Sequence, residues 1–154
     1  MFSFKKPPTA GLEPRFAILH HALEASAGRF DHWDLMLEHD GVLVTFELER
    51  LPSNTGPFTA RRLADHRLTY LEYEGHISGN RGQVVRLDRG RYREHNIDDA
   101  SKATVNETGK DERPFRYELH GQRLNAIVAC DQPIHLLPFG RLIHLHAVQW
   151  LLHD

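Results

Sequence analysis

The clearest pattern in the chain is the alternation of polar and apolar residues in DHWDLMLE, residues 31–38. Such alternation predicts a β-strand with two different faces, because successive side chains of a strand point to opposite sides. The next residues, HDG, predict a tight turn, since Asp-Gly tolerates the positive φ that short hairpin turns require. Residues 42–50, VLVTFELER, then predict the returning strand of a hairpin.

Related patterns predict the other strands. Residues 15–24 are expected to form a strand that precedes this hairpin, and residues 142–153 a strand that closes the chain. Residues 68–77 alternate again. Two more hairpins are expected, one with Asp88-Arg89-Gly90 at its tip and one that turns at His120-Gly121. Short strands joined by hairpins predict a mainly β fold with little helix, as an antiparallel β-barrel or sandwich.

Length and composition bound the domain organisation. The 154 residues, 40% of them hydrophobic, predict one domain over residues 1–154. Within it, the proline-rich residues 1–14 predict an extended arm, and the polar, aperiodic residues 96–113 predict a mobile surface loop. The single cysteine, Cys130, lies in an apolar run, which excludes an intramolecular disulfide and favours a buried thiol.

Charge and targeting signals exclude several classes of partner. The formal net charge of −2 creates no general attraction to nucleic acid or membrane, so any phosphate binding has to be local. The sequence has no signal peptide and no apolar run of about 18 residues. We therefore expect a cytoplasmic protein that does not bind membranes.

Histidine is the unusual component, with 12 residues in the chain. On the strand predicted above, His32 and Asp34 share one face about 7 Å apart at Cα, close enough to bind one metal ion. A third ligand has to come from a neighbouring strand, where only one of His20 and His21 can point the same way. Imidazole with carboxylate suits Mn, Fe or Zn. The same pattern also fits an ordinary strand with a solvated polar face.

A second metal hypothesis uses a distant histidine. His-x-Asp followed much later by a histidine is the ligand pattern of two-histidine, one-carboxylate iron oxygenases. His144 and His146 share one face of the last predicted strand, and either could be that ligand. This chain is short for such an enzyme.

The order of several motifs resembles the 3′-phosphoesterase domain of the bacterial DNA ligase D family. The similar segments are RFAILHH with DHWDLMLEHDGVL, ADHRLTYLEYEGHISGNRG, VVRLDRGRY, YELHGQRLNAIVA and WLLH. They cover roughly residues 13–95 and 114–153. The resemblance implies a small antiparallel β-barrel with a manganese-dependent site, which trims a 3′-terminal ribonucleotide or a 3′-phosphate from DNA ends during repair.

The resemblance also implies roles for individual residues. His21, His32 and Asp34 would bind Mn²⁺ or another divalent transition metal such as Zn²⁺. His66 would contact the scissile phosphate and assist catalysis, with Tyr70 nearby. Glu13 matches a glutamate of the family's amino-terminal arm. Further residues are candidates for a supporting shell around the ligands: Glu13, Glu38, His144 and His146.

Three positions depart from the family pattern. Met36 and Phe58 stand where the family has arginines, and Ala64 stands where it has glutamate. Methionine supplies neither charge nor a forked donor. Arg61 and Arg62 are the candidates to bind phosphate in their place. Two functions follow: a metal-dependent 3′-phosphoesterase acting on nucleic-acid ends, alone or with a separate DNA ligase, or a non-catalytic module of the same fold that binds metal and DNA ends.

Overall fold

The computed structural model describes residues 13–22, 31–76, 82–95 and 113–153. The expected arm at residues 1–14 and the expected loop at 96–113 therefore lie almost entirely outside the described residues. Among the described residues, no helix is long and apolar enough to cross a membrane.

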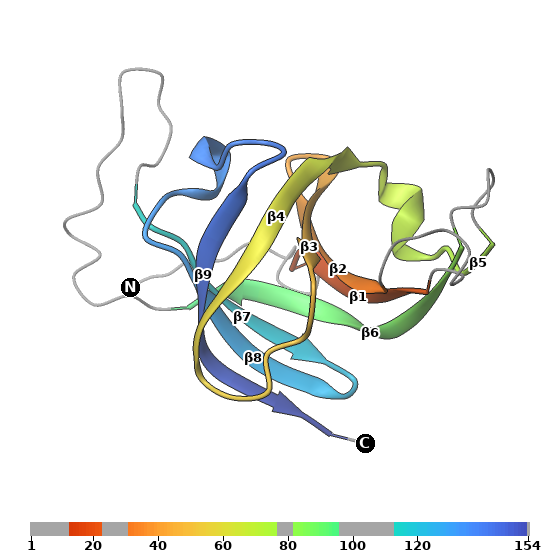
Figure 1. Ribbon diagram of the computed structural model, residues 1–154. Coiled ribbons are helices and arrows are strands. Elements are labelled where there is room, and N and C mark those ends of the chain that lie inside the picture. The colour runs from red at the N-terminus through yellow and green to blue at the C-terminus, as the bar shows by residue number, and fades with distance from the viewer. Residues whose placement is uncertain (1–12, 23–30, 77–81, 96–112, 154) are drawn as a thin grey trace.

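Eight strands form a closed antiparallel barrel, as expected from the sequence (Figure 1). The sheet order is β1-β2-β3-β4-β9-β8-β7-β6-β5, and pairing of β1 with β6 closes the ring. A ninth, two-residue strand, β5, extends the edge beside β6. The strands are β1 (Arg15–Ala22), β2 (His32–His39), β3 (Val42–Leu48), β4 (Gly56–His66), β5 (Gly75–His76), β6 (Gln83–Glu94), β7 (Arg116–Gly121), β8 (Leu124–Ala129) and β9 (Leu142–Leu152).

The β2–β3 hairpin confirms the first prediction. Its strands pair from Trp33 opposite Leu48 to His39 opposite Val42. The two turn residues, Asp40 and Gly41, have φ angles of 51° and 83°. Positive φ at both central positions is the backbone that Asp-Gly favours in a two-residue hairpin turn.

The hairpin predicted at Asp88-Arg89-Gly90 is wrong, because β6 runs through these residues without turning. The Asp88 carboxylate, which is buried, accepts hydrogen bonds of 2.8–3.2 Å from the backbone N–H groups of Gln122, Arg123 and Leu124. The aspartate therefore stabilises the turn between β7 and β8, which lies two residues later than expected. Gly90 allows β6 to pass close to the end of β7.

The alternating segment at 68–77 also differs from the prediction. It forms the 3₁₀-helical turn η3 (Leu68–Leu71) followed by the short β5. A second such turn, η5 (Ile134–Leu136), precedes β9. In a 3₁₀ turn, residues three apart share one face. Leu68 and Leu71 thus pack together against the barrel wall, and this packing replaces the strand that alternation alone predicted.

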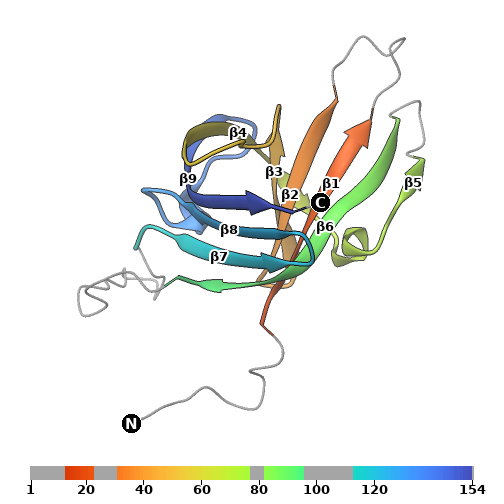
Figure 2. The same ribbon diagram turned by 90° about the horizontal axis from the view of Figure 1, so that it is seen from below.

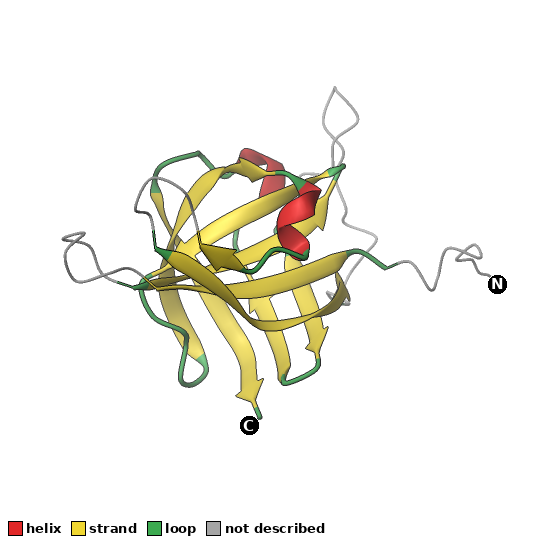
Figure 3. Cartoon of the chain, turned by 90° about the vertical axis from the view of Figure 1, so that its right-hand side faces the viewer, coloured by secondary structure: helices red, strands yellow, loops and turns green. Residues whose placement is uncertain are grey.

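The wall formed by β1, β2, β3 and β6 is covered on both sides. Its inner face contributes Phe16, Ile18 and Leu35 to the main core inside the barrel. Its outer face carries a second, smaller core, closed by η3, which lies against the outside of this wall away from β7, β8 and β9 (Figures 2 and 3). The second core consists of Ala17, Leu19, Met36, Leu43, Leu71 and Val84.

Candidate metal centre

Three predicted metal ligands come together on the outer face of the barrel wall. His21 of β1 lies directly opposite His32 of β2, with ring centroids 4.6 Å apart, and Asp34 follows two residues along β2. One ligand atom from each residue can be chosen so that all three lie within 4.8 Å of one another. This placement follows from strand alternation and from the antiparallel register of two adjacent strands.

The structure also decides between the adjacent histidines. His20 points to the opposite face of β1, where it stacks on Trp33 with ring centroids 4.9 Å apart and an interplanar angle of 15°. Its Nε2 lies 3.2 Å from the carboxylate of Asp31. His21 is therefore the ligand candidate, as the family resemblance implies.

Asp34 shows that the cluster suits a cation. The residue is 6% exposed, and its Oδ1 has no hydrogen-bond partner among the described residues. The Nε2 atom of His32 lies 3.5 Å from this oxygen. Burial, and then the carboxylate of Glu47, raise the pKa of Asp34 to about 7. A buried, unsatisfied carboxylate beside two imidazoles matches the donor set that Mn, Fe or Zn ions prefer.

Glu47 was not identified from the sequence as a residue of this site. It lies opposite Asp34 in the β2–β3 ladder, with its side chain on the same outer face. The hairpin pattern could have predicted this contact, because a two-residue turn at Asp40-Gly41 fixes the register that places Glu47 opposite Asp34. The second carboxylate adds negative potential beside the three candidate ligands, which favours a bound cation.

The two arginines predicted to bind phosphate lie on opposite faces of β4. Arg61 is opposite Glu47, in the same cross-strand row as Asp34, and its exposed side chain donates a hydrogen bond of 3.1 Å to the Gly140 carbonyl. Two strand spacings, roughly 10 Å, separate the Cα atoms of Asp34 and Arg61.

Arg62 does not join the candidate site. It is 4% exposed and donates to the carbonyl oxygens of Ile134 and Leu137 and to the Asp65 carboxylate. Its guanidinium carbon lies 4.4 Å from the centre of the Phe139 ring. These contacts fix Arg62 as a link between β4 and the segment around η5, so the phosphate-binding prediction is retained for Arg61 alone.

His66 and Tyr70 lie beside each other at the end of β4 and in η3, with ring centroids 5.5 Å apart. Nδ1 of His66 is 2.9 Å from the carbonyl oxygen of Ala64. A carbonyl only accepts, so Nδ1 carries the proton and Nε2 of the neutral ring is an acceptor. His66 is opposite Leu43, which is opposite Glu38, on the face that carries Asp34. It lies four residues along the strands, roughly 13 Å, and two strand spacings, roughly 10 Å, across the sheet from Asp34.

Glu38 forms an ion pair with Arg15 and does not lie beside the candidate metal ligands. It accepts hydrogen bonds of 3.0 and 2.8 Å from the Arg15 guanidinium and one of 2.9 Å from the Arg15 backbone N–H. These bonds hold the pKa of Glu38 below its ordinary value. The backbone carbonyl of Glu13 accepts a hydrogen bond from Arg91. Both glutamates thus join β1 to its neighbours at the end remote from His21.

The two histidines of β9 are not ligands or supporting residues for this cluster. His144 and His146 are exposed and lie opposite Thr59 and Pro57 of β4. Strands β3 and β4 separate β9 from β2, so three strand spacings, roughly 14 Å, intervene. The structure therefore does not bring either histidine to the cluster, whether as a supporting residue or as the distant ligand of the iron-oxygenase pattern.

The three departures from the family pattern have different surroundings. Met36 is fully buried in the second core, beneath η3. Phe58 packs against the main core, with its ring centroid 6.4 Å from that of Trp150. Ala64 is exposed. Position 36 thus offers no open surface to a phosphate group in this chain.

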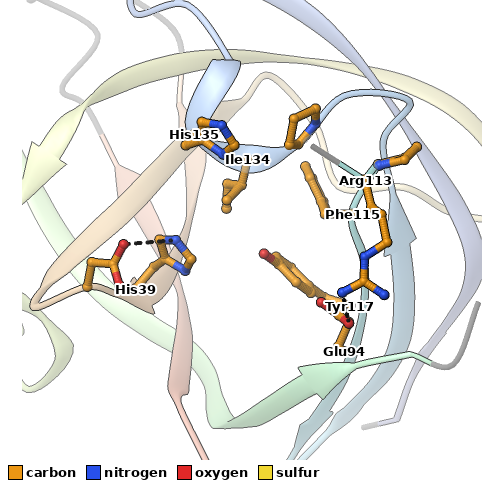
Figure 4. Close-up of a pocket in the computed structure, with 10 residues that line it drawn as sticks. His39, Glu94, Arg113, Phe115, Tyr117, Ile134 and His135 are labelled. Carbon is orange, nitrogen blue, oxygen red and sulfur yellow. Dashed lines mark hydrogen bonds and ion pairs between the residues drawn. The ribbon is translucent and has the colours of Figure 1, made fainter. Parts of the chain in front are cut away.

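A pocket of about 340 Å³ lies at the other end of β2 from the cluster (Figure 4). Phe115, Tyr117 and Ile134 form its apolar wall, and Glu94 and Arg113 form an ion pair at its side. His39, which also lines the pocket, is the last residue of β2, and His32 is the first. None of the predicted site residues lines this pocket.

The fold and the site define a closed β-barrel protein with an outward-facing His-His-Asp cluster that could hold a metal ion. The chain matches the DNA ligase D 3′-phosphoesterase domain over residues 20–129, and it belongs to that family. It is also 39% identical over 97 residues to the multifunctional non-homologous end joining protein LigD of Mycolicibacterium smegmatis. That alignment covers 57% of this chain and 12% of the relative, so the chain spans a small part of the relative's length.

Proposed function

We propose that the protein is a divalent-metal-dependent phosphoesterase that removes a 3′-terminal ribonucleotide or a 3′-phosphate from nucleic-acid ends. One observation carries the proposal: the buried, unsatisfied Asp34 oxygen lies among ligand atoms of His21 and His32. The family's description supplies the reaction class, a 3′-phosphoesterase. Mn²⁺ is the expected ion, with Zn²⁺ as the alternative from the same ligand set.

The bound ion would polarise the phosphoester and lower the pKa of a coordinated water. The protein's own residues supply the remaining chemistry. His21 and His32 bind as neutral imidazoles, and Asp34 has to lose its proton to bind, because ligands coordinate in their deprotonated forms. Arg61 is the exposed cation in the row of Asp34 and is placed to attract a phosphate oxygen.

His66 is proposed to act on the phosphate or its leaving oxygen. With Nδ1 donating to the Ala64 carbonyl, Nε2 is the nitrogen that takes up or gives up a proton. The protonated ring would donate from Nε2 to a phosphate oxygen or to the leaving oxygen. A substrate that extends from the metal ligands towards η3 would bridge the separation between Asp34 and His66, and Tyr70 would hold the His66 ring by its edge contact.

The alternative is a module of the same fold that binds metal and DNA ends without turnover. The burial of Met36, in place of the family's arginine, favours it. Positive charge arranged around the transferring group contributes much of the catalysis of phosphoryl transfer. Its loss therefore lowers the reaction rate more than it lowers the affinity for metal. In either case, the processed or protected end would be a substrate for a DNA ligase.

A nuclease and phosphatase assay separates the two functions. The purified protein is loaded with Mn²⁺ or Zn²⁺ and incubated with a 5′-labelled primer–template that ends in one ribonucleotide or in a 3′-phosphate. Shortening or dephosphorylation that disappears in His32→Ala but persists in His20→Ala supports the phosphoesterase. Tight, metal-dependent binding without turnover supports the module, and no metal binding at all would refute both.

A further inference from the structure

A basic groove lies on the same outer face of the barrel as the metal centre. Strands β1, β6 and β7 form its floor, the end of η3 forms one wall, and its volume is about 460 Å³. Three arginines line the groove: Arg15, Arg89 and Arg91. Leu71, Glu72 and His120 lie beside them in its lining. No residue of the metal centre lines it.

Strand pairing fixes the arginines of the groove in one layer. Arg91 of β6 lies opposite both Arg15 of β1 and His120 of β7, and Arg89 lies opposite Ala17. Ala17 belongs to the second core on the outer face of the wall, so these side chains share the face that carries His21. The groove and the metal centre therefore lie on the same side of the barrel wall, with the second core and η3 between them.

The local charge is positive although the whole chain is slightly acidic. Among the described residues that line the groove, Glu72 is the only carboxylate, and it pairs with Arg89 at 3.2 Å. Glu38, outside the groove, pairs with Arg15. Glu118, also outside, lies 2.6 Å from His120. Arg91 donates to a backbone carbonyl and also lowers the pKa of Glu38, so the three arginines of the groove face two carboxylates, Glu38 and Glu72.

Asp88 and Gly90 hold the arginines of β6 in place. The buried Asp88 carboxylate is bonded to the β7–β8 turn, and the Gln122 backbone N–H donates to the Arg89 carbonyl at 3.2 Å. Gly90 lies between Arg89 and Arg91 and allows close contact with β7. The strand is thus anchored on both sides of Arg89, while 46% of the Arg89 side chain stays exposed.

We propose that this groove binds the phosphodiester backbone of the strand whose 3′ end lies at the metal centre. The inference rests on the proposed function and adds a second contact region to it. Along β1, Ala17 and Arg15 are four and six residues from His21, roughly 13 and 20 Å. A duplex strand carries one phosphate per 3.4 Å of axis, so a strand that passes over η3 would reach the groove no earlier than about the fourth to sixth phosphate from the end.

The test is binding of the full chain, with Mn²⁺ present, to labelled oligonucleotides that end in a 3′-hydroxyl. Fluorescence anisotropy compares oligonucleotides of about three and about twelve nucleotides, single-stranded and duplex, across a salt series. The variant is Arg89→Ala with Arg91→Ala, both in the groove. Arg116→Ala is the matched control, because Arg116 lies on β7 outside the groove.

The double variant is expected to weaken binding of the long oligonucleotide roughly tenfold at low salt. It should also reduce the slope of log affinity against log salt by about 1.4 for a single strand or about 1.8 for a duplex, which identifies the form bound. Binding of the short oligonucleotide and of Arg116→Ala should not change. Glu72→Gln should strengthen binding of the long oligonucleotide, because it removes the carboxylate of the groove.

The outcomes separate this inference from the function on which it rests. If the wild type processes 3′ ends but the double variant binds long oligonucleotides as tightly as the wild type, the groove proposal alone is overturned. Equal weakening of short and long oligonucleotides overturns it as well, because the groove should contact only the longer strand. If the wild type neither binds nor processes any oligonucleotide, the proposed function fails together with the groove.

Discussion

Asp34 and Glu47 lie directly opposite each other in the β2–β3 ladder, with both carboxylates on the outer face of the barrel. Asp34 is buried, and the combination of burial and the Glu47 charge makes its ionised form costly in the metal-free protein. The same arrangement makes the position favourable for a cation. Stability and metal affinity should therefore respond to pH in opposite directions.

The metal-free protein should lose stability as pH rises. The pKa of Asp34 is raised from 3.8 to about 7, so the folded state binds more protons than the unfolded chain between these values. The contribution is fully present below about pH 4 and is lost as pH passes about 7. Asp34→Asn should therefore be more stable than the wild type at pH 8, by about 2–4 kcal/mol, and similar to it near pH 4.

Urea unfolding in the presence of a chelator measures this difference at the two pH values. The matched control is Asp131→Asn, an exposed aspartate just after β8, which should not gain stability at pH 8. Equal stability of Asp34→Asn and the wild type at pH 8 would show that the carboxylate is not destabilised by its surroundings.

Metal affinity should depend on His21 and His32 but not on His20. Replacing either ligand by alanine removes one of three protein donors and should weaken Mn²⁺ or Zn²⁺ binding by about a hundredfold or more. His20→Ala removes only a ring stacked on Trp33 and should change affinity less than about threefold. Isothermal titration calorimetry measures all three variants. A large loss in His20→Ala would place the ligand on the other face of β1.

Metal binding should also release a proton near neutral pH. Asp34 is mostly protonated at pH 6 and has to ionise to bind, so apparent affinity should fall by about tenfold per pH unit below its pKa of about 7. Calorimetry in two buffers with different ionisation enthalpies reports the number of protons released. No proton release at pH 6 would contradict a coordinating role for Asp34.

The sequence sufficed for the ligand cluster because the cluster depends on local rules. Strand alternation places His32 and Asp34 on one face, the hairpin turn is encoded by Asp40-Gly41, and the neighbouring strand offers one histidine per face. The burial of Met36 depends instead on η3. Alternation assigns Met36 to the polar face, but Leu68 and Leu71, more than thirty residues away, cover that face.

Long-range contacts also explain the errors at β6 and β4. Asp-Arg-Gly has the composition of a turn, but the Asp88 carboxylate is used by the turn between β7 and β8. Arg61 and Arg62 are adjacent in the sequence, and only the register of β4 against β3, with its irregularity between Leu43 and Thr45, decides which one faces outward. A single sequence holds no local signal for either arrangement.

Met36→Arg should destabilise the protein rather than restore a phosphate-binding arginine. Met36 is fully buried in the second core beneath η3, so the guanidinium would lose its hydration without a partner or would displace η3. A cost of about 3 kcal/mol or more is expected, compared with less than about 1.5 kcal/mol for the volume-conserving Met36→Leu. Urea unfolding compares the two variants. A stable Met36→Arg protein with increased 3′-processing activity would show that the position can open to substrate.

Gly90→Ala should be among the most damaging small substitutions in the barrel. A Cβ at Gly90 would overlap the carbonyl oxygen of His120 and lie 2.6 Å from Cα of Gly121, both backbone atoms of the paired strand. The β6–β7 ladder would have to separate, so a loss of about 3 kcal/mol or more is expected. Gly41→Ala is the matched control: its φ is 83° but its Cβ would meet no atom within 4 Å. It should cost only about 1 kcal/mol, from backbone strain alone. Urea unfolding that ranked Gly41→Ala as the more damaging change would contradict the close approach of β6 and β7.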